Sequence, residues 1–597
     1  MYTIQHNFDI THLTTFGIPV KTKIYAEYSS VAELIKLSRS EEFLNNEVLH
    51  IGGGSNLLFI NDFNGMIIHS AIKGISEYRK DDNTVFAIVG AGEKWTDFVD
   101  WCVEKGYAGV ENLAHIPGEV GASAIQNVGA YGVEAKDVIF SVEAFDIETR
   151  KVITLTNQQC RFAYRDSIFK HDAKGRYFIV RVSFKLTPST KAVNLNYGPL
   201  KSLEEKLGHK PSIKDVHQEI TAIRSAKLPD PKDIGSAGSF FKNPVVNRSL
   251  FEKTIQKNNP DIPFYDIDDN NVKLPAGWLI EHAGLKGFQI GGAKVFEKQC
   301  LVLTNHNNAF GSDVVNLCNH IRKTVLKKYG VILHPEVNFI DTNINITFLG
   351  TGTSKGVPEV ACKCPVCTSN DEHDKRLRSS IIVNTHGLNL LIDASPDFRY
   401  QALKHDIISL DATLITHSHY DHVGGIDDLR PFCSDSDNKL PLFVKNDVNE
   451  DLHRRLDYCF RQQPYPGVPT FDIRIIPDVP FYFKGLKITP IFVNHANLPI
   501  VGFRIGDFAY ITDAKTIDER EMEKLYGLKL LVINALRYED HFSHLTVDEA
   551  LRIVDELKPQ QTLFTHMNHD IGLHKNVNAN LPANVQLAYD GLSVSVK

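Results

Sequence analysis

Short apolar runs bounded by turn residues recur along the chain and predict β-strands. The run Ile-Thr-Phe-Leu at 346–349 follows a polar stretch and precedes a glycine turn, so it predicts the first strand of a new structural unit. The run at 413–415 predicts another strand, directly before a histidine-rich loop. At 314–329, in contrast, apolar residues recur at helical spacing and Gly330 follows, which predicts a helix with a glycine stop. These patterns predict a domain boundary near residue 343.

The length of 597 residues also predicts about two to four domains, because a single hydrophobic core stops growing well below that size. Hydrophobic residues make up 43% of the chain and charged residues 23%, which is typical of globular proteins and argues against long disorder. The net charge of -7 and the isoelectric point near 6.4 give no broad attraction to nucleic acid or to an anionic membrane. Small molecules are therefore the expected partners.

The N-terminus lacks a basic region followed by an apolar stretch, and no run of about eighteen apolar residues occurs. We therefore expect a cytoplasmic protein without a membrane span, and the pattern predicts no particular oligomeric state. Three of the nine cysteines crowd together as Cys362, Cys364 and Cys367. In a cytosolic chain this clustering favours a metal site over disulfides, and three thiolates are one ligand short of a closed tetrahedral zinc site.

Glycine-rich loops mark the first half of the chain. Gly52, Gly53 and Gly54 follow an apolar segment, and consecutive glycines let backbone amides approach a phosphate where a Cβ would block it. Leu57 stands where the Rossmann fingerprint needs its third glycine, so another fold must hold any dinucleotide. Further glycine-containing loops follow at 89–93, 111–118 and 126–132. Together these loops favour a site for a large ligand over a set of ordinary turns.

The glycine loops and four later motifs resemble the UDP-N-acetylenolpyruvoylglucosamine reductase family. The motifs are Cys-Arg-Phe-Ala-Tyr-Arg-Asp-Ser at 160–167, Lys-Leu-Pro-Asp-Pro at 227–231, Gly-Ser-Phe-Phe-Lys-Asn-Pro at 238–244 and His-Pro-Glu-Val at 334–337. They occur in the family's order and cover residues 10 to 340. The resemblance implies an α+β, non-Rossmann FAD-binding reductase module, with an FAD domain at 1–200 and a C-terminal substrate-binding domain at 201–342.

The resemblance also implies an activity in peptidoglycan synthesis. The family reduces the nucleotide sugar UDP-N-acetylglucosamine enolpyruvate to UDP-N-acetylmuramate, using NADPH and FAD. This reaction needs hydride at one vinyl carbon, stabilisation of the enolate that develops, and a proton for the other carbon. Arg165 matches the enolate-stabilising group, Glu336 its acidic partner and Ser239 the proton donor. His334 departs from the pattern, because an acidic residue is expected before the proline.

Further residues are implied by the same motifs. The cofactor-binding positions correspond to Gly52, Gly53, Gly54, Ser55, Asn56, Gly118, Gln126, Asn127, Gly129 and Ala130. The nucleotide-sugar contacts correspond to Lys227 and Asn243, with Tyr197 in a substrate-covering loop and Gln299 as a further candidate. The alternative for this half is a flavin-binding sensor or another FAD-dependent oxidoreductase, against which the Gly-Ser-Phe-Phe and Pro-Glu-Val motifs argue.

The loop after residues 413–415 carries a strong metal motif. His417 and His419 occupy alternate positions and can point the same way, while Asp421 and His422 can turn toward a second ion. Two adjacent cations would share a water whose pKa is lowered toward neutrality. The motif resembles that of the metallo-β-lactamase fold, which implies an αβ/βα sandwich over 344–597.

This second resemblance supplies the other expected ligands. His495 would complete the first site, Asp513 would bridge both metals and His566 would complete the second site, giving two catalytic divalent ions, zinc or manganese. The cysteine cluster and the motifs at 376–380 and 393–399 further resemble the cyclic-phosphate phosphodiesterase of phosphonate degradation. That branch implies one structural zinc, with His569 as the fourth ligand, and a small phosphate ester as substrate.

The substrate-facing histidine of that branch corresponds to His544, which could bind a phosphate oxygen or protonate a leaving alkoxide, with His541 as the alternative. Hydrolysis of a lactone or thioester and RNA processing remain alternatives for residues 344–597, because the fold hosts many chemistries. No Lys/Arg-rich arm stands out, which argues against a nuclease. A non-catalytic scaffold is disfavoured because all seven expected ligands are present.

Overall fold

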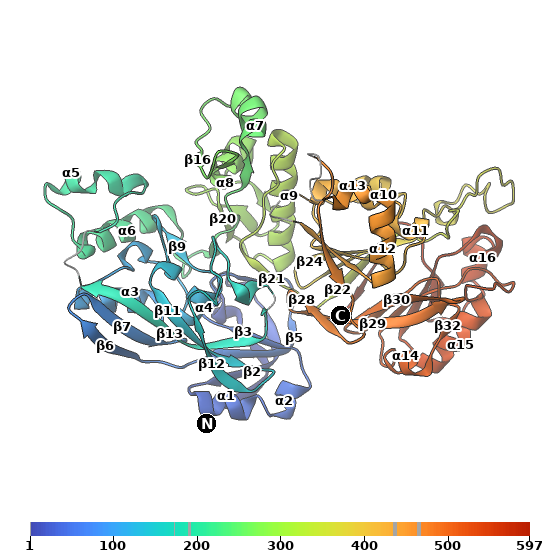
Figure 1. Cartoon of the computed structure of the whole chain (residues 1–597), viewed down its shortest axis with the longest axis horizontal. Helices are drawn as coiled ribbons and strands as arrows, with labels where there is room; N and C mark the ends of the chain where they lie inside the picture. The colour runs from blue at the N-terminus through green and yellow to red at the C-terminus, as the bar shows by residue number, and fades with distance from the viewer. Residues whose placement is uncertain (1, 172, 189–192, 434–438, 462–466) are drawn as a thin grey trace. The chain divides into compact units, whose positions relative to one another are not determined.

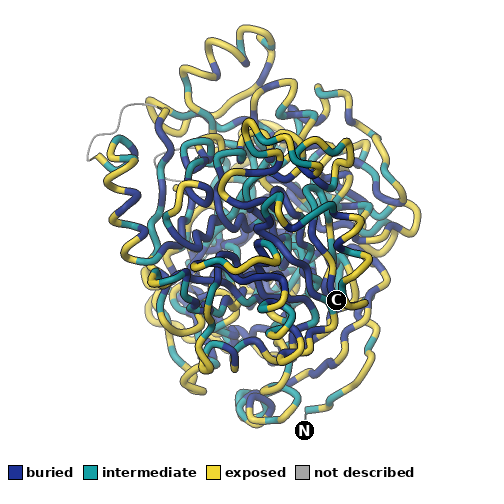
Figure 2. Tube along the Cα trace, turned by 90° about the vertical axis from the view of Figure 1, so that its right-hand side faces the viewer, coloured by how far each residue is buried: buried dark blue, intermediate teal, exposed yellow. Residues whose placement is uncertain are grey.

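The computed structural model describes residues 2–171, 173–188, 193–433, 439–461 and 467–597. The chain forms two compact units, Met1–Asp341 and Thr342–Lys597 (Figure 1). Buried residues, dark blue in Figure 2, are enclosed by intermediate and exposed ones. No helix among the described residues combines the length and the apolar character needed to cross a bilayer.

An antiparallel sheet organises the middle of the first unit. Its strands, in spatial order, are β12 (Lys151–Thr156), β11 (Ile139–Asp146), β13 (Tyr177–Pro188), β7 (Thr84–Gly90) and β6 (Ile75–Asp81), and β8 (Tyr107–Ala108) also pairs with β13. Its core includes residues of α3 (Trp95–Lys105), α4 (Val120–Ile125), α5 (Leu203–Leu207) and α6 (Ile213–Lys227). Phe98, Val182 and Val216 are fully buried in this one core, so α6 packs with the FAD-domain segment although it follows residue 200.

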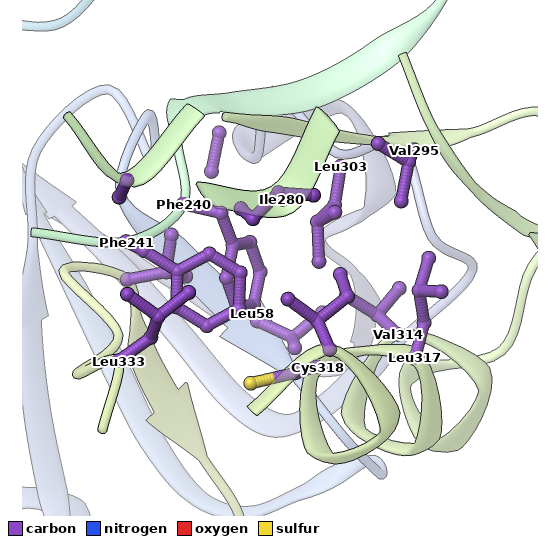
Figure 3. Packing of buried hydrophobic residues seen from close by; sticks show 14 of the residues in the cluster. Leu58, Phe240, Phe241, Ile280, Val295, Leu303, Val314, Leu317, Cys318 and Leu333 are labelled. Carbon is purple, nitrogen blue, oxygen red and sulfur yellow. The ribbon is translucent and has the colours of Figure 1, made fainter. Parts of the chain in front are cut away.

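The first and last segments of the unit share a second core, part of which is drawn in Figure 3. The N-terminal sheet has the order β1 (Thr3–Asp9), β2 (Lys21–Tyr28), β5 (Phe63–Ser70), β3 (Val48–Ile51). Two small sheets follow, β14 (Gly235–Ser239), β20 (Val302–Asn305), β19 (Ala293–Val295), β18 (Gln289–Ile290) and β15 (Val245–Asn247), β17 (Asn271–Lys273), β16 (Tyr265–Asp266). Leu58 packs among Phe240 and Phe241 in this core. Strand β21 (Asn338–Ile340) pairs in parallel with β4 (Leu57–Phe59), which joins the two ends of the unit.

Two expectations from the hydrophobic pattern can be compared with single elements. Helix α9 (Gly311–Tyr329) ends at Gly330, whose φ of 70° and N–H bond to the carbonyl of Leu326 form a left-handed cap, so the predicted helix is confirmed. Strand β22 (Ile344–Gly350) confirms the strand predicted at 346–349. The glycine loop at 52–54 lies between strands β3 and β4, so it does not open a helix as a Rossmann loop would.

The second unit is a sandwich of two sheets. One has the order β27 (Phe471–Ile475), β26 (Leu440–Val444), β25 (Ala412–Leu414), β24 (Leu388–Ile392), β23 (Ser380–Thr385), β22, β36 (Ser593–Val596). The other has the order β28 (Phe481–Phe483), β29 (Leu486–His495), β30 (Leu498–Ile505), β31 (Phe508–Ile511), β33 (Leu530–Asn534), β34 (Gln561–Thr565), β35 (Val585–Leu587), and β32 (Thr516–Ile517) pairs with β29. Phe348, Leu390 and Phe503 are fully buried in the core between the sheets.

Helices cover the outer face of each sheet (Figure 1). On the first sheet these are α10 (Phe398–Lys404) and α12 (Asn446–Arg455), followed along the chain by α13 (Asp457–Phe460). On the second sheet they are α14 (Glu519–Glu523), α15 (Val547–Leu557) and α16 (His574–Asn578). The arrangement of helix, sheet, sheet and helix confirms the predicted αβ/βα sandwich.

Candidate functional site

Arg165, from the middle of the first unit's sequence, and Glu336, from its last segment, form an ion pair. The Nε atom of Arg165 lies 2.9 Å from Oε1 of Glu336, and both side chains are largely buried. The Nη2 atom of Arg165 also donates to the carbonyl of Gly129, at 2.7 Å. The guanidinium is therefore fixed in orientation, while its remaining donors are available to a ligand.

The backbone around Ser239 brings this residue close to Glu336. The N–H of Glu336 donates to the carbonyl of Phe240 at 2.8 Å, and the N–H of Lys242 donates to that of His334 at 2.9 Å. Phe240 is fully buried, so the core shown in Figure 3 anchors the strand end that carries the exposed Ser239. The three expected catalytic residues of the first unit therefore come from adjoining segments.

Lys170 is a further polar group at this site that the motif analysis missed. Its Nζ atom donates to the carbonyl of Arg165, at 3.1 Å, and burial, together with the charge of Lys242, lowers the pKa of Lys170 to about 8. Arg165 has a left-handed backbone with φ of 56°, a conformation that costs energy in a residue with a Cβ. The contact with Lys170 stabilises that conformation. The sequence signal was its place three residues after the Arg-Asp-Ser motif.

The glycine loop packs closely against Gly118. A Cβ on Gly53 would lie 3.2 Å from the Cα of Gly118, and Ser55 Oγ donates to the carbonyl of Pro117 at 3.1 Å. Asn56 Nδ2 donates to Gln126 Oε1 at 2.6 Å and to the carbonyl of Glu336 at 3.1 Å. The loop thus joins the expected cofactor-binding positions to the Arg165 and Glu336 pair.

Asn127 is placed differently from its neighbours in this group. Its side chain is buried and donates to Glu134 Oε2 at 2.9 Å and to the carbonyl of Ala163 at 2.8 Å, while its Oδ1 accepts from the N–H of Lys136. Its side-chain groups are occupied by the protein, so it stabilises the loop that carries Gly129 and Ala130 and has no side-chain donor left for a ligand.

A small cavity lies beside the glycine loop, with a volume of about 60 Å³. Gly52 and Ile125 line it together with Glu119, which the motif analysis did not single out. Glu119 Oε1 lies 2.9 Å from His69 Nε2, and His69 Nδ1 lies 3.0 Å from Glu27 Oε2. Burial opposes protonation of His69, but the two carboxylates outweigh it and raise its pKa. A carboxylate held in a mostly apolar cavity can accept hydrogen bonds from a ligand.

The four expected nucleotide-sugar residues are spread around the unit. Asn243 Oδ1 accepts from the N–H of Ala276 at 3.0 Å, and Gln299 Oε1 lies 3.0 Å from the position of a Cβ on Gly277, so both lie at the start of α8 (Ala276–Ile280). Lys227 ends α6 and is exposed. The ring of Tyr197 makes an edge contact with that of Tyr131, at 6.0 Å between centroids. The structure thus brings Asn243 and Gln299 together.

The metal motif of the second unit lies where several strands end. His417 follows β25, His495 ends β29, Asp513 follows β31 and His566 follows β34. His417 and His419 have ring centroids 4.6 Å apart and, with Asp513, bring one possible ligand atom each within 4.8 Å of one another. We call His417, His419 and His495 the first ligand group.

The second ligand group consists of Asp421, His422 and His566. Asp513 Oδ1 lies 3.4 Å from His422 Nε2 and 3.2 Å from His566 Nδ1, so its carboxylate joins this group as well as the first. Burial opposes ionisation of Asp513, but His566 and His422 outweigh it and lower the pKa of its carboxyl group. An ionised carboxylate between two imidazole groups is suited to bridge two cations.

Hydrogen bonds orient several of these imidazoles. His495 Nδ1 donates to the carbonyls of Asp513, at 2.9 Å, and Ser543, at 2.8 Å, which leaves its Nε2 free to accept a cation. His544 has its ring centroid 4.6 Å from that of His495, and burial lowers the pKa of His544 to about 3. His541 lies next to His544, with 5.0 Å between the ring centroids.

Asp393 is a supporting residue of the metal site that the sequence analysis did not assign a role. Its Oδ2 lies 2.7 Å from His422 Nδ1, and its Oδ1 accepts from the N–H of Thr416 at 2.8 Å. Asp393, Asp513 and His566 have left-handed backbones, with φ of 63°, 57° and 58°. Such conformations are concentrated at functional sites, where the surrounding fold maintains them.

The donor atoms fit a pair of divalent cations. Three buried nitrogen atoms, His417 Nε2, His422 Nε2 and His544 Nδ1, have no hydrogen-bond partner among the described residues. Unpaired buried nitrogen atoms are costly unless a ligand satisfies them. The mixture of imidazole and carboxylate groups is one that zinc and manganese accept.

The cysteine cluster forms a separate group with His569. Cys364 Sγ lies 3.2 Å from His569 Nδ1 and Cys362 Sγ lies 3.7 Å from it, while Cys367 completes a set whose possible ligand atoms lie within 4.8 Å of one another. Burial alone would raise the pKa of the Cys364 thiol. Hydrogen bonds from the Cys367 N–H and from His569 outweigh this effect and lower the pKa to about 6. His569 Nε2 lies 3.1 Å from Glu359 Oε2, a second supporting carboxylate that the motifs did not indicate.

Comparison with protein families finds three matches along the chain. Residues 22–156 match the FAD binding domain, and residues 230–340 match the C-terminal domain of UDP-N-acetylenolpyruvoylglucosamine reductase. Residues 388–567 match the beta-lactamase superfamily domain. A reductase module and a metallo-β-lactamase-fold domain are thus both present, as the two resemblances implied.

Individual relatives match one unit each. The UDP-N-acetylenolpyruvoylglucosamine reductase of Neisseria gonorrhoeae is 48% identical over 349 residues, which is 58% of this chain and 100% of the relative. That of Bacteroides fragilis is 46% identical over 338 residues, which is 56% of this chain and 100% of the relative. Among solved structures, a diphosphatase from the PhnP family is 38% identical and covers 43% of this chain and 98% of its own, with a TM-score of 0.40.

Proposed function

The chain belongs to the UDP-N-acetylenolpyruvoylglucosamine reductase family, and we propose that its first unit uses NADPH and FAD to reduce UDP-N-acetylglucosamine enolpyruvate to UDP-N-acetylmuramate. The observation that carries the assignment of roles is the fixed pair of Arg165 and Glu336 beside the strand end with Ser239. Bound FAD would supply hydride to one vinyl carbon.

The residues of this site would handle the charge and the proton. The Arg165 guanidinium would stabilise the negative charge that develops on the carboxylate side of the substrate, and Glu336 would keep it in orientation. The Ser239 hydroxyl would deliver the proton. Lys227, Asn243, Gln299 and Tyr197 would contact the nucleotide sugar.

The glycine loops would hold the dinucleotide. Gly52, Gly53 and Gly118 are half-buried and could let backbone groups approach a phosphate, whereas Gly54 packs against the backbone of Leu13; Asn56 and Gln126 would fix the end of the loop next to Glu336. The small cavity beside Gly52, with Glu119 as its carboxylate, would hold a part of the cofactor. Asn127 would act by stabilising the loop.

A direct assay tests this function. The purified full-length protein should be yellow and should oxidise NADPH only when the enolpyruvyl nucleotide sugar is present to be reduced. Equal NADPH oxidation with and without this substrate would assign the chain to a different flavin-dependent reaction.

For the second unit we propose a dinuclear-metal phosphodiesterase that acts on small phosphate esters. The supporting observation is that the first and second ligand groups share Asp513 while His544 stands beside them. Two bound divalent cations would polarise a phosphoryl oxygen and lower the pKa of a shared water. His544, neutral because burial holds its pKa near 3, would donate a hydrogen bond to a phosphate oxygen or to the leaving group.

A substrate comparison on the full chain separates this proposal from the other chemistries of the fold. With manganese or zinc supplied, a model phosphodiester should be hydrolysed faster than a lactone, a thioester or RNA. The variant His417→Ala, which removes one ligand of the first group, should lose this activity and keep the reductase activity. Preference for a lactone or thioester would overturn the substrate class.

A further inference from the structure

Helix α12 contacts two separate loops that carry ligands of the first group. At its C-terminal end Arg455 Nη1 donates to the carbonyl of Ser418, at 2.8 Å. Ser418 is the residue between His417 and His419. A charged donor therefore fixes the peptide that joins two ligands of one metal.

The same turn of the helix holds Arg455 in place. Arg455 Nη2 lies 2.5 Å from Asp451 Oδ2, one helical turn earlier, and the Asp451 side chain is 9% exposed. Burial opposes ionisation of Asp451, but hydrogen bonds from Arg454 and Ser418 and the charge of Arg455 outweigh it and lower its pKa. Ser418 is thus contacted by α12 through its carbonyl and through its hydroxyl group.

The residue that precedes α12 contacts the hairpin that carries the third ligand of the group. Lys445, the residue that precedes the helix, donates from Nζ to the carbonyl of Pro499. Pro499 pairs with Asn494 in the hairpin of β29 and β30, next to His495 at the end of β29. The Lys445 side chain is only 18% exposed, so it is held against this hairpin.

Residues outside α12 support the second group, and one of them, Asp393, also contacts Thr416 next to His417. His422 is held by Asp393, at 2.7 Å, and His566 Nδ1 lies 3.3 Å from Ser379 Oγ. We propose that α12 is a positioning element for the first ligand group, in which Arg455 and Lys445 set the affinity of the first metal separately from that of the second. This inference rests on the proposed dinuclear centre and adds to it the residues that tune one of its two ions.

The sign of the effect distinguishes positioning from simple electrostatics. Arg455 is a cation close to a cation site, so its charge alone repels the metal, and its removal would then strengthen metal binding. If Arg455 positions the ligands, its removal weakens binding, by the 10- to 100-fold that is typical for residues that support metal ligands.

The test uses the full-length protein and cobalt(II) as the probe, titrated in competition with a chelator. In Arg455→Met one exchangeable ion should bind about 10- to 100-fold more weakly, while the other changes less than about twofold. The cobalt spectrum of this variant at one equivalent should match that of His495→Ala and differ from that of His566→Ala. Arg455→Lys should recover part of the loss, because lysine can still donate to the Ser418 carbonyl.

Arg454→Met is the matched control. Arg454 is on the same helix and pairs with the same aspartate, but it contacts no ligand-bearing loop among the described residues, so its loss should leave both ions unchanged. If Arg455→Met fails to fold, Lys445→Met should show the same selective loss. Equal weakening of both ions, or tighter binding in Arg455→Met, would overturn the inference. A wild type with no exchangeable ion would overturn the proposed dinuclear centre itself.

Discussion

Arg165 and Glu336 are 171 positions apart in the chain, yet the Nε atom of Arg165 lies 2.9 Å from Oε1 of Glu336. The contact joins the segment that follows the glycine loops to the last segment of the first unit. A guanidinium held in this way needs little reorganisation when negative charge develops near it, which is the condition for effective electrostatic stabilisation.

Replacing Arg165 by alanine should slow oxidation of the reduced flavin by the enolpyruvyl substrate by about 10²- to 10³-fold, the usual cost of losing one such donor. The variant should retain FAD, because Arg165 contacts one expected cofactor position, Gly129, and most of the others lie in other loops. Stopped-flow absorbance of the flavin measures both. Arg181→Ala is the control, since it removes an arginine that pairs with Glu143 on the sheet surface. Normal reoxidation in Arg165→Ala would remove this residue from the catalytic group.

Ser239→Ala should abolish most steady-state turnover, with a loss of about 10²- to 10⁴-fold, because the proton donor would be missing. Reduction of the flavin by NADPH should continue at its normal rate, so the variant should accumulate reduced flavin in the presence of both substrates. Ser202→Ala, at an exposed position, serves as the comparison. Full turnover by Ser239→Ala would mean that another group supplies the proton.

Mild chelation should stop hydrolysis of a model phosphodiester and leave NADPH oxidation intact. Histidine and carboxylate ligands exchange their metals more readily than a set of three thiolates and one imidazole. Manganese added afterwards should restore hydrolysis without added zinc, while metal analysis should find one zinc per chain throughout. Persistent hydrolysis after removal of every exchangeable ion would contradict the metal-dependent mechanism.

Cys364→Ser should lose the tightly held zinc and lower the thermal stability of the second unit, because structural zinc binding is coupled to folding. All three tryptophans, Trp95, Trp101 and Trp278, belong to the first unit, so their fluorescence should report an unchanged transition there. Calorimetry of the full chain should show the other transition at lower temperature. Cys433→Ser, outside the cluster, should change neither zinc content nor stability. An unchanged zinc content in Cys364→Ser would rule out this ligand.

The pH dependence of stability should reveal Asp590. Burial raises the pKa of its carboxyl group to about 6, despite hydrogen bonds from Leu377 and Thr351. The unfolded chain has the ordinary value near 3.9, so the folded state binds more protons between these values. Its stabilising contribution, at most about 3 kcal/mol, is complete below pH 4 and is lost as the pH rises through 6.

Asp590→Asn should therefore show a smaller loss of stability between pH 4 and 6 than the wild type. The measurement is the unfolding free energy of the second unit in denaturant across that range. Asp555→Asn removes a carboxyl group that is almost fully exposed and should keep the wild-type slope. An identical slope in Asp590→Asn would show that this carboxyl group titrates normally.

Local patterns predicted those parts of the fold that local chemistry determines. Helix α9 was visible because its apolar spacing and its glycine cap lie within one segment, and strand β22 because turn residues bound it. The parallel pairing of β21 with β4 was not visible, because nothing in either short strand specifies a partner so far away in the chain. The packing of α6 with Phe98 and Val182 depends on tertiary structure in the same way.

The candidate site residues also divide into those that have a local sequence signal and those that have none. The metal ligands could be predicted because their spacing is part of recognisable motifs. Asp393, Glu359 and Glu119 could not, because a single carboxylate has no local sequence signal and acquires its role only when the fold places it against His422, His569 or His69. Arg455 could not be predicted either, because the group that it contacts at the metal site is the backbone carbonyl of Ser418, which has no sequence signal.

Each unit is completed by its own final strand. β21 pairs with β4 near the start of the first unit, and β36 pairs with β22 at the start of the second. On the ribosome, neither unit can therefore close until its last residues have emerged from the exit tunnel. A chain that ends early within the second half would still carry both β4 and β21, and with them the pairing that joins the two ends of the first unit.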